Sequence, residues 1–306
     1  MPTKFIFPLF IGILFSLSPR AWSSEKIKIV TTTQDLAALA QSVAGDLAEV
    51  DSLGKGTQDP HQIEAKPSFI MKLRNADLIL IQGLELESAW VEQLIVGSRN
   101  PKIAKGSSGY LELAPSLDPI EIPHGKISRA EGDIHPGGNP HFQLDPIRMG
   151  KAAVLIAQRL GDLRPESKEA FRKNAEQLNQ TLQEKTKAWA QRLKATGITE
   201  VVTYHKTFAY FFDRFQIRNR FFIEPKPGIP PTTKHLQELI ENMKKENIQL
   251  VLIENYFSLD GLEKIKSQIP GVRGQKVAVS VGGSPGLDTN EKVIEALVQV
   301  FEASKK

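Results

Sequence analysis

The chain has 306 residues, of which 41% are hydrophobic and 24% charged, and it contains no cysteine. This length is sufficient for two domains with buried cores, and the composition is that of an ordinary globular protein. Disulfides and thiolate metal ligands are excluded, so core burial must supply the stability. The formal net charge is only +4. With no basic patch interleaved with aromatic residues, and no phosphate-binding glycine loop, we expect no nucleic-acid partner.

Residues 1–23 have the pattern of a signal peptide. A basic start that includes Lys4 precedes an apolar stretch, residues 5–19, which is short for a membrane span and contains proline. Small residues at Ala21 and Ser23 then predict cleavage after Ser23. Removal of this segment, which has two basic residues and no acid, lowers the net charge from +4 to +2. We expect a periplasmic protein, with a retained N-terminal anchor as the alternative. Without cysteine, a lipoprotein is not expected.

Residues 24–144 are predicted to form an N-terminal α/β lobe. Short β-rich runs at 26–33, 48–53 and 77–83 alternate with helical stretches. The helical stretches cover residues 36–45, 66–76 and 87–97. Strand, helix and strand at this spacing are typical of a parallel sheet covered by helices. Residues 103–144 are rich in Gly, Pro and His, and we expect them to be irregular.

Residues 145–197 are predicted to form a long linking helix. Asp145 is a favourable N-cap, and Pro146 suits the first helical position. Apolar residues then recur at helical spacing, with a break at "LRPES", residues 163–167. An apolar stripe along one side should pack this helix against both neighbouring lobes, so that it forms a rigid connection between them.

Residues 198–306 are predicted to form a C-terminal α/β lobe. Its β-rich runs lie at residues 200–204, 219–224, 249–256 and 275–281, with helical stretches between them. The predicted fold class is therefore α/β: two lobes, each a parallel four-stranded sheet with flanking helices, joined by a long rigid linking helix. Such sheets bind ligands beyond the carboxyl ends of their strands, which favours a site in a cleft between the lobes.

Three of the six histidines have settings that suggest a shared site. His61 ends "TQDPH" and His141 ends "GNPH", so each follows a proline in a loop. Proline fixes its own φ and drives the preceding residue to extended geometry, which leaves each imidazole little freedom and lowers the ordering cost of binding. His205 comes at the carboxyl end of a β-rich run, on the cleft side of a parallel sheet. The ordinary alternative is a turn or a strand end without a ligand.

These three histidines lie far apart in the sequence, and no zinc finger or HExxH helix has such spacing. They can meet only in a tertiary site between the lobes. Three neutral imidazoles without cysteine suit a borderline divalent ion, and Zn²⁺ first. His124 and His135 lie in a polar, Gly-rich segment that we expect to be a solvated loop. An auxiliary metal-collecting loop is the alternative for that segment.

The quoted motifs, taken in order, resemble a known family. Supporting stretches include "KIKIVTTTQDLAALAQSVAGD", "GTQDPHQIEAKPS", "GNPHFQLDP" and "HKTFAYFFDRF", and they run through the whole mature chain. This ordered set is similar to that of the periplasmic zinc- and manganese-binding proteins that feed ABC-type metal importers, a zinc-uptake family with a rigid linking helix. The resemblance implies a periplasmic solute-binding protein, monomeric and not an enzyme. Such a protein would deliver Zn²⁺, or alternatively Mn²⁺, to a membrane permease. The loop before the NPH motif, residues 121–138, has only two histidines, which suggests a periplasmic metallochaperone as a further partner.

The resemblance also implies the ligands. His61, His141 and His205 match the metal-binding positions, and histidine at the third position, where many manganese binders have Glu, favours zinc. Many members add an Asp on the last strand of the second lobe, but this chain has Ser280 there. Asp288 is a candidate for the missing ligand, and water or a flexible carboxylate would otherwise complete the tetrahedron.

An open fourth position is also a feature of catalytic zinc sites, so two other classes of function stay under consideration. An envelope zinc hydrolase would need a general base beside the metal, and Glu224 and Glu254 are strand-end candidates for that role. An adhesin or scaffold with a structural metal is the third interpretation.

Overall fold

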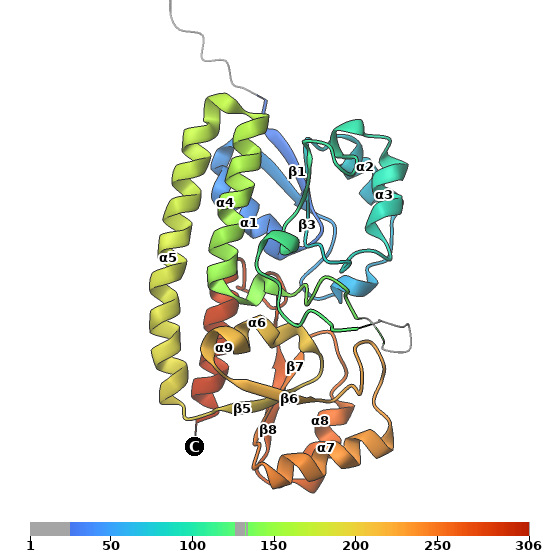
Figure 1. Ribbon diagram of the computed structural model, residues 1–306, viewed down its shortest axis with the longest axis vertical. Helices are drawn as coiled ribbons and strands as arrows, with labels where there is room; N and C mark the ends of the chain where they lie inside the picture. The colour runs from blue at the N-terminus through green and yellow to red at the C-terminus, as the bar shows by residue number, and fades with distance from the viewer. Residues whose placement is uncertain (1–24, 126–131, 133, 306) are drawn as a thin grey trace, which may run out of the picture.

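The computed structural model describes residues 25–125, 132 and 134–305, so the predicted signal peptide lies outside the described residues (Figure 1). The chain forms two parallel four-stranded sheets, with strand orders β2-β1-β3-β4 and β6-β5-β7-β8. The first sheet comprises β1 (Ile27–Thr31), β2 (Ala48–Ser52), β3 (Leu78–Ile81) and β4 (Tyr110–Glu112). The second comprises β5 (Glu200–Thr203), β6 (Arg218–Phe222), β7 (Leu250–Glu254) and β8 (Arg273–Val277). This arrangement confirms the predicted fold class.

Helices cover the sheets, as the alternating pattern predicted. The first lobe has α1 (Gln34–Ala44), α2 (Pro67–Arg74) and α3 (Val91–Ser98). The second has α6 (Ala209–Phe215), α7 (Thr233–Lys245), α8 (Asp260–Gln268) and α9 (Asn290–Ala303). Strands β3, β5 and β7 are buried at every residue. Interior strands of a covered parallel sheet need apolar side chains on both faces, which explains the apolar runs of β3 and of residues 250–253 in β7.

One strand lies in the segment that was expected to be irregular. β4 pairs with β3 at the edge of the first sheet, with Ile79 opposite Tyr110. It has three residues, all partly exposed. A strand this short shows no periodicity, which is why the sequence did not indicate it.

The predicted long linking helix is divided in two. Asp145 is the N-cap of α4 (Pro146–Leu163), as expected, and its side chain accepts a hydrogen bond from Ile147 N. The chain then reverses, and α5 (Lys168–Ala195) runs back antiparallel to α4 (Figure 1). Pro165 causes the break, because it lacks an N–H and keeps Arg164 out of helical geometry. α4 packs on the first lobe, and α5 is the helix that links the lobes.

α5 contributes to the cores of both lobes, which makes the link rigid. Phe171, Ala175 and Leu182 are buried in the first core. Trp189 and Leu193, farther along the same helix, are buried in the second core. Separating the lobes from this helix would expose large apolar side chains, at about 1.5–3 kcal/mol for each large one. None of the described helices is both long and apolar enough to cross a membrane.

Candidate metal centre

The structure brings His61, His141 and His205 together between the lobes. Each offers one ring nitrogen, and these three atoms lie within 4.8 Å of one another. The three ring centroids are 5.2 to 5.4 Å apart. His141 and His205 are buried, and His61 is half-buried. Residues remote in sequence thus form one compact cluster of imidazoles.

The loop after β2 fixes the ring of His61. Asp59 Oδ1 accepts hydrogen bonds from His61 N at 3.0 Å and from His61 Nδ1 at 2.8 Å. Burial raises the pKa of the Asp59 carboxyl, but its bonds to His61 outweigh burial and hold the pKa below its usual value. Trp90 Nε1 donates to Pro60 O at 3.0 Å and anchors the turn. Because Nδ1 is hydrogen-bonded to the carboxylate, Nε2 is the ring nitrogen that faces the cluster.

A second carboxylate orients His205, which follows β5. Glu224, just beyond β6, is buried, and its Oε1 accepts a hydrogen bond from His205 Nδ1. The other oxygen of Glu224 accepts from Gly228 N at 3.0 Å. Glu254, at the end of β7, accepts from His205 N at 3.3 Å, and burial raises the pKa of its carboxyl to about 8. A carboxylate on Nδ1 again directs Nε2 toward the cluster, as is common for metal-binding histidines.

His141 is the most buried member of the cluster. Its backbone N donates to Asn139 Oδ1 at 2.9 Å, a local turn that sets the ring direction. In the described part of the chain neither ring nitrogen has a hydrogen-bond partner. Burial and then the neighbouring histidines hold its pKa well below the usual value, so the ring is neutral. An unpartnered buried polar atom costs about 1–3 kcal/mol, which a metal ion bound at that nitrogen would offset.

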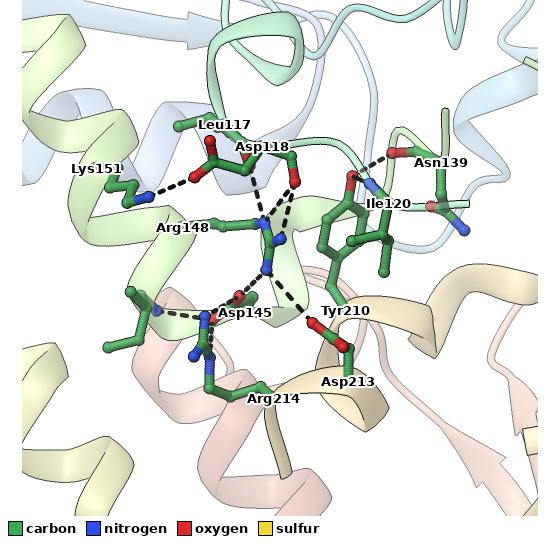
Figure 2. Close-up of polar contacts among 11 residues, drawn as sticks. Leu117, Asp118, Ile120, Asn139, Asp145, Arg148, Lys151, Tyr210, Asp213 and Arg214 are labelled. Atoms are coloured by element: carbon green, nitrogen blue, oxygen red, sulfur yellow. Dashed lines mark hydrogen bonds and ion pairs between the residues drawn. The ribbon is translucent and has the colours of Figure 1, made fainter. Parts of the chain in front are cut away.

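Side chains of the second lobe hold the loop that carries His141. Tyr210 Oη of α6 donates to Asn139 O at 2.6 Å, a contact visible in Figure 2. Asn139 Nδ2 donates to Lys206 O at 3.0 Å, directly after His205. The loop of His141 is therefore fixed relative to His205, although it precedes α4 in the chain.

A buried ion pair anchors the other end of this loop (Figure 2). Asp145 is 0% exposed. Arg148 of α4 donates to Asp145 Oδ2 at 2.6 Å, and Arg214 of α6 donates to both carboxylate oxygens at 2.9 Å. One carboxylate thus caps α4 and joins the two lobes. Removing one partner of such a buried pair typically costs about 3–5 kcal/mol.

Asp288 lies outside the cluster. Its side chain is exposed and pairs with Lys292 Nζ at 2.7 Å. Ser280, where the resemblance led us to expect an aspartate, forms a side-chain hydrogen bond with Asp35. Asp288 is not among the residues whose ligand atoms lie within 4.8 Å of one another, so the structure does not bring this expected fourth ligand to the histidines.

His135 joins the site instead, which the sequence did not indicate. Its Nε2 lies 3.3 Å from Nε2 of His61, and the two rings are stacked with centroids 5.4 Å apart. Burial, with the neighbouring His61 and His205, lowers the pKa of His135 to about 4. The expectation of a solvated loop is wrong for His135, although His124 is exposed. The available signal was the short distance in sequence between His135 and His141.

The geometry gives no support to a hydrolase. Glu224 and Glu254, the candidate general bases, are both buried and already bonded to His205. A general base must reach a water on the metal, and these carboxyl groups lie on the Nδ1 and backbone side of that histidine.

Comparison with known proteins is consistent with this site. The family described as zinc-uptake complex component A, periplasmic, matches residues 29–303. The zinc-binding lipoprotein AdcA of Streptococcus pneumoniae (strain ATCC BAA-255 / R6) is 29% identical over 296 residues, or 96% of this chain and 57% of AdcA. The manganese ABC transporter substrate-binding lipoprotein PsaA of Streptococcus mitis is 24% identical over 260 residues, or 82% of this chain and 81% of PsaA.

A solved structure shares the fold. The crystal structure of ZnuA has a TM-score of 0.74 at 22% identity, with 92% of this chain and 100% of that one covered. The chain spans little more than half the length of AdcA. Both sequence relatives are named as binding proteins and not as enzymes.

Proposed function

The chain belongs to the family of periplasmic zinc-uptake components, and from this premise we propose that it is the substrate-binding protein of an ABC-type metal importer. In this proposal it captures Zn²⁺ between its lobes in the periplasm and delivers the ion to a membrane permease. One observation carries the proposal: three imidazoles converge, and the buried ring of His141 has no other partner among the described residues. Mn²⁺ is the alternative cargo, as in the relative PsaA.

The donor atoms favour zinc over manganese. Imidazole nitrogens suit Zn²⁺, whereas Mn²⁺ prefers carboxylate, carbonyl and water oxygens. Asp59 and Glu224 are the carboxylates nearest the ligands, and each is bonded to the Nδ1 of a histidine. They therefore act on the rings, which they orient and make more basic, and do not supply oxygen ligands.

The orientation of the rings suits metal capture. Nδ1 of His61 and of His205 is hydrogen-bonded to a carboxylate, which turns Nε2 toward the cluster, and His141 is neutral because it is buried. Each ring therefore has a nitrogen lone pair available for the arriving cation. A permease is the partner that must then compete for the ion, and a periplasmic metallochaperone is a second proposed partner on the loading side.

Calorimetric titration of the chelator-treated mature chain with Zn²⁺ and with Mn²⁺ tests the proposal. We expect tight one-to-one zinc binding, weaker manganese binding, and collapse of both in His141→Ala. His124→Ala, which changes an exposed histidine in the same part of the chain, is the matched control and should bind like the wild type. Undiminished zinc binding by a folded His141→Ala variant would show that the metal binds elsewhere.

A further inference from the structure

Three histidines leave one position of a tetrahedral zinc site without a protein ligand. The carboxylates beside the cluster do not fill it, since Asp59 is bonded to His61 and Glu224 to His205. Ser280 forms a side-chain hydrogen bond with Asp35. The fourth donor must therefore be water or a side chain that the family pattern does not predict.

The distance of His135 from His61 matches that between two ligands of one ion, although His135 lies outside the group whose ring nitrogens are all within 4.8 Å of one another, so its ring would have to move toward His141 and His205. Its Nε2 is 3.3 Å from Nε2 of His61. With Zn–N bonds of about 2.0–2.1 Å, two nitrogens of one tetrahedral site lie about 3.3–3.4 Å apart. The observed separation thus equals the edge of a zinc tetrahedron, and it is longer than most N–H···O hydrogen bonds.

The hydrogen bonds of the two rings also suit a metal ion shared by His61 and His135. His61 Nδ1 donates to Asp59, so Nε2 of His61 carries a lone pair. The ring of His135 also has a hydrogen bond with the backbone of Leu84. When Nδ1 of each ring carries the proton, two Nε2 lone pairs face each other, and a cation between them would remove their repulsion. The pair is therefore arranged to share an ion.

We propose that His135 is the fourth metal ligand and completes a site of four imidazoles. This inference rests on the proposed function and refines it. His135 also lines, with His141 and His205, a cavity of about 220 Å³ beside the cluster. A ligand at that place would cover the ion on the side where the cavity opens. Four nitrogen donors would favour Zn²⁺ and Co²⁺ and would disfavour Mn²⁺, which prefers oxygen ligands.

Cobalt binding tests the proposal, because the visible bands of Co²⁺ report its coordination geometry and donor set. The mature chain should give the intense bands of a tetrahedral nitrogen site, and His135→Ala should alter them. Zinc affinity, measured by competition with a chelator, should fall at least about tenfold, because loss of even an outer-shell partner costs about 10–100-fold. His135→Asp, which substitutes an oxygen donor, should bind Mn²⁺ more tightly relative to Zn²⁺ than the wild type does. His124→Ala should leave every reading unchanged.

The possible results distinguish failure of His135 as a ligand from failure of the proposed transport function. If His135→Ala keeps the wild-type spectrum and zinc affinity while His141→Ala loses both, His135 is not a ligand and the transport function stands. If both variants bind as the wild type does, the proposed function fails together with the fourth ligand. Circular dichroism of each metal-free variant establishes that it is folded.

Discussion

Asp35→Asn is expected to stabilise the protein at neutral pH. Asp35 lies in the first turn of α1 and is only 2% exposed. Its Oδ1 accepts hydrogen bonds from two residues of the second lobe, Val281 N at 3.0 Å and Asn290 Nδ2 at 3.3 Å. Burial raises the pKa of this carboxyl to about 6, from an ordinary value of 3.8. Asparagine keeps an acceptor oxygen for both donors and removes the buried charge.

The expected gain in folding stability follows from the raised pKa of Asp35. About 2 pKa units correspond to about 3 kcal/mol of disfavoured ionisation. The N-terminus of α1 stabilises the charged form by about 0.3–1 kcal/mol, which leaves a net gain of about 2 kcal/mol for Asp35→Asn at pH 7.5. The pKa is higher in the folded chain, so folding takes up a proton between about pH 4 and pH 6. Wild-type stability therefore falls as pH rises through this window, and the advantage of the variant vanishes below about pH 4.

Urea unfolding of the metal-free wild type and variant at pH 7.5 and at pH 4 measures the effect. The difference between the two proteins at each pH cancels the titration of all other groups. Asp46→Asn, which neutralises an exposed carboxylate just after α1, is the control and should change stability by less than about 0.5 kcal/mol. A loss of stability in Asp35→Asn at pH 7.5, or a gain that does not depend on pH, would refute the reasoning.

Four further outcomes are expected. Glu224→Gln should lower zinc affinity about 10–100-fold without unfolding the protein, because the ring of His205 loses its carboxylate; unchanged affinity in calorimetry would contradict this role. Asp288→Ala should leave zinc affinity unchanged, and a tenfold loss would restore that residue as a ligand. Because the pKa of His141 is held well below its usual value, protons compete for this ring only at acidic pH. Zinc affinity should therefore change little from pH 8 to pH 7, and fall as the pH drops further. X-ray scattering should give nearly equal radii of gyration with and without zinc, since α5 is buried in both cores; a gross difference would count against a rigid link.

The sequence predicts the sheets better than it predicts the connections. β3 and the first four residues of β7 are apolar because both faces of a parallel sheet are covered, and this pattern is visible in the residues themselves. The reversal between α4 and α5 is less visible. Pro165 indicates a break, but helical periodicity on either side of a break does not say in which direction the chain continues.

In the candidate site, too, the features with a local sequence signal could be predicted and the tertiary contacts could not. Proline before His61 and His141 is a local signal, because it restricts the backbone that carries each ring. The contact between His135 and His61 has no local signal, since it joins residues 74 positions apart in the sequence. Asp288 was a candidate only through its closeness in sequence to Ser280, and the pairing of its carboxylate with Lys292 is equally tertiary.

The contacts around the site divide the histidines into a fixed pair and a separate third ring. His141 belongs to the first lobe by sequence, but the side chains that hold its loop, Tyr210 and Arg214, come from the second lobe, as does His205. His61 lies on a first-lobe loop whose polar contact with the second lobe includes one neutral hydrogen bond, from Asn255 Nδ2 to Gly56 O at 2.9 Å. A buried ion pair is harder to separate than a neutral bond between partly exposed groups. With α5 limiting separation of the lobes, we expect the metal to leave when the loop of His61 moves away from the His141 and His205 pair.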